Sequence, residues 1–137
     1  MSDRYAQLVN STFGGLVAAP LGLPRPARLR RYHPGDPLID GAVLLGAAPG
    51  GRLAEGTARV LAEAGVRAST TRERPLREAA ASAGLDAGLF NPESAGPERF
   101  QGLVFDASGI ADSSELVELQ RFFYPAVGRL ARGGRVV

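Results

Sequence analysis

The chain of 137 residues has no cysteine, no tryptophan and no lysine, and its single histidine is His33. Without cysteine it can form neither disulfides nor thiolate nucleophiles nor thiolate zinc sites. The absence of lysine excludes a Walker-A phosphate lysine, a Schiff base and a Tyr-x-x-x-Lys catalytic pair. One histidine cannot build a multi-histidine metal centre. We therefore expect no metal site. The functions that this composition still allows are acid–base chemistry by carboxylates and binding without catalysis.

All sixteen basic side chains are arginines, and fourteen acidic residues leave a formal net charge of only +2. The composition, with 45% apolar and 22% charged residues, is typical of a globular chain. Its length allows one domain with a sizeable core rather than two. The small net charge and the scarcity of aromatic residues argue against a nucleic-acid partner.

Long hydrophobic runs are also missing. The longest apolar stretch near the start, residues 16–23, is interrupted by Pro20 and Gly22. It falls far short of the ~20 apolar residues that a membrane span needs, and no secretory signal is evident. We expect a soluble, cytoplasmic protein without a membrane partner.

Residues 40–51 contain the clearest structural signal. Ala42, Val43, Leu44 and Leu45 run without polar alternation between glycines, which is typical of a strand buried on both faces of a parallel sheet. A glycine-rich turn and a helical pattern follow. Strand, glycine turn and helix open a nucleotide-binding α/β fold. We predict a three-layer, Rossmann/flavodoxin-like, mostly parallel sheet.

Four further elements are expected before residue 111. Residues 52–64 predict a helix, residues 66–70 a strand, residues 75–83 a short helix and residues 100–110 a second strong strand, whereas residues 85–97 predict irregular structure. The helix over 52–64 has an apolar stripe that should face the sheet: Leu53, Thr57, Val60, Leu61 and Ala64.

The longest helix should begin after Asp112, which with Glu115 resembles a capping box. Its expected buried stripe is Leu116, Leu119, Phe123, Val127 and Leu130. Pro125 predicts a kink or restart near residues 121–124 because proline removes a backbone hydrogen bond. Phe122 lies beside the stripe and is either a core residue or an interface contact. Residues 135–137 predict a last strand.

The N-terminal 39 residues differ in character. Residues 3–9 predict a short helix, and the proline-rich residues 20–37 predict an arm on a surface. Five basic residues lie in this arm: Arg25, Arg28, Arg30, Arg31 and His33. They form either a solvated structural arm or an anion-docking patch for a phosphate or an acidic protein. We divide the chain into this arm, 1–39, and a degenerate Rossmann-like domain, 40–137, and expect a segment cut off at its last strand.

Two places are weak candidates for cofactor binding. Gly46, Gly50 and Gly51 match the first part of a dinucleotide turn, but Arg52 stands where the third glycine of that motif is expected. The ribose-binding acidic residue expected about twenty residues later is also missing. The alternative is a tight turn kept for packing. Asp106 ends a predicted strand, where α/β sheets place ligands, yet it also fits ordinary turn chemistry.

The remaining titratable residues favour no catalytic role. Glu55, Glu63, Glu115 and Glu118 lie on helical patterns and should face solvent. His33, between Tyr32 and Pro34, is expected to be a loop residue rather than a catalytic base.

Several segments together resemble a short-chain dehydrogenase/reductase from its first to its fifth strand: residues 43–46, 102–110, 122–125 and 134–137. In particular, the run Leu-Val-Phe-Asp-Ala-Ser-Gly-Ile, residues 103–110, resembles the Asn-Asn-Ala-Gly strand end of that superfamily, with one residue inserted and the asparagines gone. The leader, residues 21–26 with 29–32, is similar to the start of the high-molecular-weight 3-oxoacyl-[acyl-carrier-protein] reductases of actinobacteria. The use of arginine in place of lysine fits a GC-rich genome of that kind.

In that family a flavodoxin-like first domain lacks the catalytic set, and a second domain binds the nicotinamide cofactor and carries the Ser-Tyr-Lys residues. The resemblance covers most of the first domain and none of the second, so no catalytic residue is carried over. It implies the non-catalytic part of an NADH- or NADPH-dependent reductase of fatty acid metabolism. It also implies three partners: a C-terminal reductase domain of the same chain, a second copy in a homodimer, and an acidic acyl carrier protein.

Two other classes of function stay open from the residues alone. One is a nucleotide- or flavin-binding domain that uses the turn at Gly46, Gly50 and Gly51. The other is a free-standing interaction module without a reductase partner.

Overall fold

A computed structural model of the chain describes residues 4, 11–12, 31–94 and 98–137. Two compact units are distinguished, Met1–Arg31 and Tyr32–Val137. The helix predicted over residues 3–9 lies outside the described residues apart from Arg4, and so do Arg25, Arg28 and Arg30 of the arm. The second unit holds the elements of the fold.

The second unit alternates strands and helices. Its elements are β1 (Ala42–Ala47), α3 (Ala54–Glu63), β2 (Ala68–Thr70), α4 (Arg74–Ser82), β3 (Ala87–Leu89), β4 (Phe100–Asp106), the 3₁₀ helix η1 (Ser113–Leu116), α5 (Val117–Ala126), the 3₁₀ helix η2 (Val127–Arg129) and β5 (Leu130–Val136).

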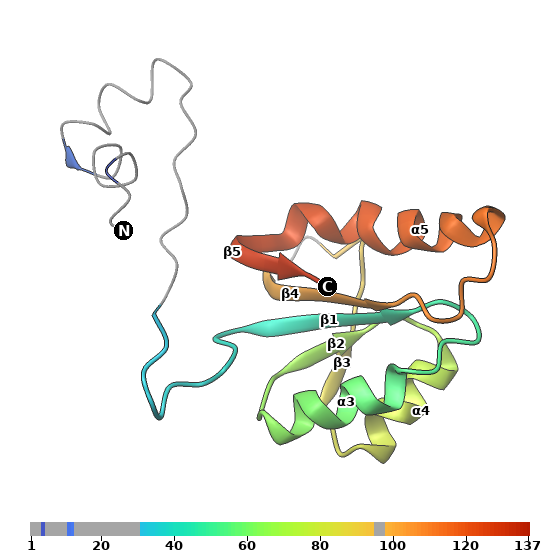
Figure 1. Ribbon diagram of the computed structural model, residues 1–137, viewed down its shortest axis with the longest axis horizontal. Coiled ribbons are helices and arrows are strands. Elements are labelled where there is room, and N and C mark those ends of the chain that lie inside the picture. Colours follow the sequence, from blue (N-terminus) through green and yellow to red (C-terminus); the bar gives the residue numbers. More distant parts are fainter. Residues whose placement is uncertain (1–3, 5–10, 13–30, 95–97) are drawn as a thin grey trace. The chain divides into compact units, whose positions relative to one another are not determined.

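The five strands form one sheet in the order β3-β2-β1-β4-β5, and every pairing is parallel. α3 and α4 cover one face and α5 covers the other (Figure 1). The prediction of a three-layer, parallel α/β fold is confirmed. The strand order is that of the Rossmann fold and differs from the 2-1-3-4-5 order of flavodoxin.

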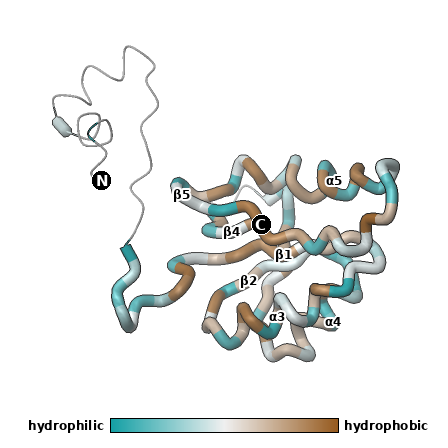
Figure 2. The backbone as a smooth tube through the Cα atoms, in the orientation of Figure 1, coloured by the Kyte–Doolittle hydropathy of each residue, from teal (hydrophilic) through white to brown (hydrophobic). Residues whose placement is uncertain are grey.

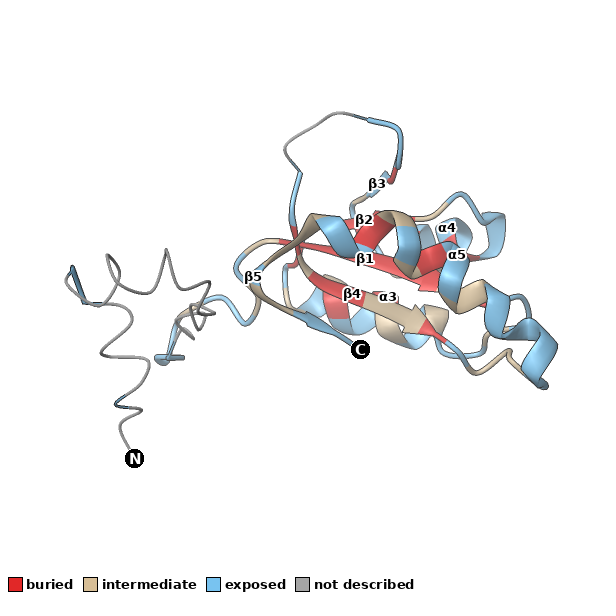
Figure 3. Ribbon diagram, turned by 90° about the horizontal axis from the view of Figure 1, so that it is seen from above, coloured by how far each residue is buried: buried red, intermediate tan, exposed pale blue. Residues whose placement is uncertain are grey.

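β1 lies at the centre of the sheet and is buried on both sides, as its unbroken apolar run predicts (Figures 2 and 3). Val43 and Leu45 point to the face of α3 and α4, where they pack with Leu61 and Leu76. The alternate residue Leu44 packs on the face of α5. Because successive side chains of a strand alternate between faces, one strand supplies both cores.

The stripe predicted for the first helix is only partly right. Leu53 and Val60 are 59% and 64% exposed, and the buried residues of α3 are Ala58 and Leu61. A small alanine and one leucine therefore face the sheet and allow close packing.

β3 is a second difference, because it forms within residues 85–97, where irregular structure was predicted.

The stripe predicted for the last helix is only partly right, since Phe123 and Leu130 pack against the core. Leu116 and Val127 are exposed, and Leu130 begins β5. The buried residues of α5 are Phe122 and Ala126, so Phe122 is a core residue rather than an interface contact. The predicted stripe was spaced for one continuous α-helix. In the structure, 3₁₀ turns with fewer residues per turn lie at both ends of α5 and shift which side chains face the sheet.

The ends of this helical segment follow the sequence more closely. Asp112 is the N-cap of η1, and its Oδ1 accepts the Ser114 N–H at 2.7 Å. Glu115 reaches back to the Ala111 N–H at 2.6 Å. Pro125 lies in the last turn of α5, and the helix gives way to 3₁₀ geometry immediately afterwards.

β5 begins at Leu130, five residues before the predicted start at Arg135. Gly133 has φ of 81°, and the pairing with β4 shifts register between Phe100 and Gly102. The double glycine is thus an irregularity inside the strand rather than a turn before it. No helix in the described part of the chain is long and apolar enough to cross a membrane.

Candidate functional site

In open α/β sheets, ligands bind at the carboxyl ends of the strands where the strand order reverses. Here that point lies between β1 and β4. The pairing register places Ala47, the last residue of β1, beside Asp106, the last residue of β4. The glycine turn and Asp106, distant in sequence, are therefore brought together.

The three candidate glycines have different roles. Gly46 is buried within β1, where an added Cβ would overlap the ring of Phe122. Gly50 and Gly51 form the turn itself, with φ of 75° at Gly50 and a bond from the Gly51 N–H to the Ala48 carbonyl at 2.9 Å. Gly46 thus allows α5 to approach the sheet, and only the other two shape the loop.

The side chain of Asp106, the last residue of β4, lies against the start of α3. The residue is 5% exposed. Oδ2 accepts the Leu53 N–H at 2.7 Å, and Oδ1 accepts the Ser108 N–H at 2.9 Å. The neighbouring Arg52 N–H donates to Ser108 Oγ at 2.8 Å. Backbone N–H groups that a helix N-terminus would offer to an anion are thus taken by this chain's own side chains.

The ionisation of Asp106 follows from these contacts. Burial raises the pKa of the carboxyl, but hydrogen bonds from Ser108, Leu53 and Ala54 lower it by more, so the pKa lies below its ordinary value. The group is an anion at neutral pH, placed at the positive end of the α3 dipole.

The loop after β4 also closes over the turn after β1. An added Cβ at Gly51 would lie 2.7 Å from Asp106 Oδ2, and one at Gly109 would overlap the Pro49 carbonyl oxygen. The Ala48 N–H donates to the Asp106 backbone oxygen at 2.9 Å. A phosphate approaching α3 here would meet a carboxylate and a packed loop. The hydrogen bonds of Asp106 hold the turn after β1 and the loop after β4 together. They occupy backbone N–H groups at this point, which are then not free to bind an anion.

The other predicted residues do not join this site. His33 lies in an exposed turn, where its N–H donates to Asp36 Oδ2 at 3.0 Å. Glu55 bonds Arg59 at 3.0 Å, and Glu118 bonds Arg121. Within residues 31–94 and 98–137 no group of three or more acidic or histidine side chains could hold a metal ion.

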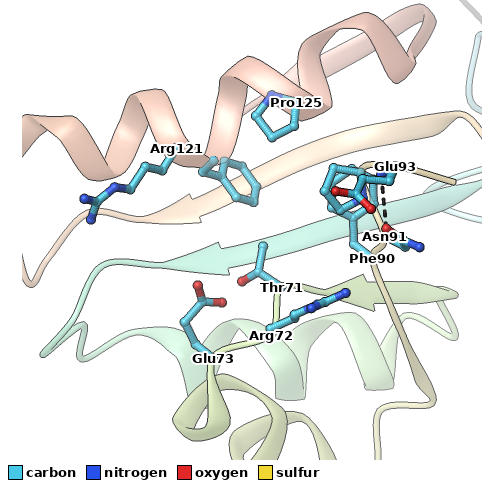
Figure 4. A pocket seen from close by; sticks show the side chains of 10 residues that line it. Thr71, Arg72, Glu73, Phe90, Asn91, Glu93, Arg121 and Pro125 are labelled. Atoms are coloured by element: carbon cyan, nitrogen blue, oxygen red, sulfur yellow. Dashed lines mark hydrogen bonds between the residues drawn. The ribbon is translucent and has the colours of Figure 1, made fainter.

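A cavity of about 370 Å³ opens beside the carboxyl ends of β2 and β3 (Figure 4). Its lining combines apolar rings with charged and polar side chains, contributed by the loops after β2 and β3 and by α5: Thr71, Arg72, Glu73, Phe90, Asn91, Pro92, Glu93, Arg121, Phe122 and Pro125. Thr71 and Arg72 stand about where the ribose-binding acidic residue was expected and is missing, so the sequence did not mark them as site residues. The position of Phe90 directly after a strand was hidden because β3 was not predicted.

Comparison with protein-family models gives no match for this chain. A search of curated proteins gives no match either. A function is therefore proposed from the sequence resemblance together with the fold and the geometry at the strand ends.

Proposed function

We propose that this chain is the structural, non-catalytic α/β domain of an NADH- or NADPH-dependent 3-oxoacyl-[acyl-carrier-protein] reductase. In that protein a C-terminal reductase domain of the same chain would convert a β-keto group to a β-hydroxy group. The proposal rests on the sequence resemblance. The parallel α/β sheet agrees with that resemblance in fold class, whereas its strand order is that of the Rossmann fold and not the flavodoxin order that the resemblance implies. Packing against the reductase domain and within a homodimer would then be the work of these residues.

One observation favours a structural over a cofactor-binding role, and it is the Asp106 carboxylate on the N-terminus of α3. Its two oxygens already accept the Leu53 and Ser108 N–H groups. Binding a pyrophosphate there would require a buried anion to leave and two loops to separate. A negative charge at this point repels a phosphate, whereas an open helix N-terminus attracts one.

The basic arm is assigned to a partner protein. Arginines suit carboxylate and phosphate groups because the guanidinium fork donates two parallel hydrogen bonds. We propose that Arg25, Arg28, Arg30 and Arg31 meet the acidic acyl carrier protein that presents the substrate.

Calorimetric titration tests the structural role. NADH, NADPH and FMN are titrated in turn into the 137-residue chain, and we expect no saturable heat up to about 1 mM ligand, a limit that corresponds to roughly 4 kcal/mol of binding free energy. Micromolar binding of any of the three would overturn the structural role and favour a nucleotide- or flavin-binding domain.

The reductase assignment has a separate readout. The complete product of the gene is purified and assayed for NADH- or NADPH-dependent reduction of a 3-oxoacyl thioester. We expect turnover that persists when Asp106 is replaced by Asn, because the proposed chemistry lies in the other domain. A complete gene product without reductase activity would instead favour a free-standing interaction module.

A further inference from the structure

The cavity beside β2 and β3 lies on the face of the sheet that α5 covers. Figure 1 shows α3 and α4 on the opposite face and α5 on this one. Thr71 and Arg72 follow β2, Phe90 and Asn91 follow β3, and Phe122 comes from α5. The volume of about 370 Å³ falls in the range of small-molecule sites. Its position at the carboxyl ends of parallel strands is where α/β sheets bind ligands.

Aromatic rings and a proline form the apolar part of the wall. Phe90 and Phe122 are 4% and 5% exposed, so their rings are held in the core. Phe90 meets Phe100 edge-on with 5.6 Å between ring centroids. Pro125 adds a rigid surface on α5 (Figure 4). A fixed apolar wall of this kind favours a rigid, flat ligand, because binding such a ligand costs little conformational freedom on either side.

Of the four charged side chains that line the cavity, three lie next to a group of opposite charge or at a favourable helix end. Arg121 bonds Glu118 on the same helix. Glu73 is the N-cap residue of α4, where the helix dipole favours a negative charge. Glu93 lies between Pro92 and Ser94, whose carbonyl oxygens both accept from Arg129, so a positive charge adjoins it.

Arg72 differs from these three. It is exposed, and in the described residues its guanidinium has no hydrogen bond or ion pair. Figure 4 shows its side chain running along the cavity toward Phe90 and Asn91. A guanidinium without a carboxylate partner suits an anionic group on a ligand.

Thr71 supplies a second, independent observation. Its Oγ1 is buried and lacks a hydrogen-bond partner in the described part of the chain. A buried hydroxyl without a partner is costly and uncommon. Figure 4 shows this side chain directed from the end of β2 toward α5. Thr71 lines the cavity, and its hydroxyl makes no hydrogen bond that a ligand would have to replace.

We propose that this cavity binds a small monoanion with a flat apolar body, such as an aryl carboxylate. The acidic group meets Arg72, Thr71 Oγ1 donates to or accepts from the ligand, and the flat body lies against Phe90, Phe122 and Pro125. This site is separate from the loops that Asp106 closes, and it does not depend on the assignment to a reductase.

The test is an NMR titration of the isotope-labelled 137-residue chain with 2-naphthoate, and with the uncharged 2-naphthamide as a matched probe. We expect saturable shifts of backbone amides in residues 70–73, 90–93 and 121–125, with Kd of about 1 mM or tighter, as ligand efficiency suggests for this size of ligand. The amide should bind at least about 10-fold more weakly, because it cannot pair with a guanidinium.

Two variants and a control assign the contacts. Arg72→Gln should weaken 2-naphthoate at least about 10-fold, and Thr71→Val, which keeps the shape of the side chain, about 3-fold or more. Arg67 is an exposed arginine directly before the first residue of β2, away from the cavity, so Arg67→Gln should leave the Kd for 2-naphthoate unchanged. Equal binding of acid and amide, equal effects of Arg72→Gln and Arg67→Gln, or no saturation by about 10 mM would overturn the proposal.

Discussion

Asp106 illustrates what a single carboxylate can do at the end of a strand. It accepts the Leu53 N–H from the start of α3 and the Ser108 N–H from its own loop. Asp106→Ala leaves both donors without a partner at a part-buried site. We expect the free energy of unfolding to fall by about 1–3 kcal/mol, measured by urea denaturation.

Asp86→Ala is the matched control, since Asp86 is an exposed aspartate on a loop. It should leave the free energy of unfolding almost unchanged. Equal stabilities of the two variants would show that the Asp106 contacts do not hold the start of α3.

The same residue makes stability depend on pH. Because the pKa of Asp106 is lowered in the folded chain, folding favours its ionised form. The stabilisation is complete above the unfolded-state pKa of about 4 and is lost as pH falls through the lower folded-state pKa. The stability difference between wild type and Asp106→Asn should therefore be largest near neutral pH and shrink in acid. A difference that grew on acidification would contradict this.

At the scale of elements, α5 approaches β1 through one glycine and one ring. A Cβ at Gly46 would overlap the ring of Phe122, which also packs on Phe105 with 5.0 Å between centroids. Gly46→Ala should lower the free energy of unfolding by about 1–3 kcal/mol because the site is overpacked. In a Phe122→Leu background the smaller side chain should remove most of this cost, which denaturant melts of the four chains can measure.

Gly56→Ala gives the control with the opposite sign. Gly56 lies in α3, and an added Cβ there meets nothing within 4 Å. The exchange should raise stability by about 0.5–1 kcal/mol through helix propensity. A cost of Gly46→Ala that persisted unchanged with Phe122→Leu would show that the ring is not the cause.

Which elements the sequence predicts depends on how local their signals are. The run Ala42–Leu45 predicts β1 correctly because burial on both faces requires unbroken apolar residues. β3 is three residues, Ala-Gly-Leu, with exposed positions, and only pairing with β2 makes it a strand. The buried stripe of the last helix was predicted only in part because 3₁₀ turns, which no residue pattern marked, flank α5.

The candidate site was harder to predict than the fold. Gly46, Gly50, Gly51 and Asp106 were identified as weak candidates for cofactor binding, with a structural turn as the alternative, yet the sequence could not show that the carboxylate lies on the start of α3. That contact joins positions 53 residues apart and depends on β1 pairing with β4. The cavity beside Thr71 and Phe90 depends likewise on β2 and β3 being neighbours.

On the scale of the whole second unit, two apolar cores share one sheet. Leu76 anchors the core under α4 and Leu103 the core under α5, and both are fully or almost fully buried. Because β1 contributes to both cores, we expect them to unfold together. Leu76→Ala and Leu103→Ala should each cost about 2–5 kcal/mol and keep a single transition.

Amide NMR signals in α4 and α5, followed through a urea titration, measure this coupling. Both sets should vanish at the same midpoint in each variant. Val60→Ala, at an exposed position of α3, should move the midpoint little. Separate midpoints for the two helices would show that the two faces are independent.

The interlock of Pro49 and Gly51 with Gly109 has an evolutionary consequence. Replacing Asp106 alone frees the start of α3 but leaves Gly109 lying over the turn. Moving only the loop after β4 away from the turn breaks the hydrogen bond from the Ala48 N–H to the backbone carbonyl oxygen of Asp106. Each of these steps costs stability before any ligand could enter, so a cofactor site at this end of the sheet would require several coordinated substitutions.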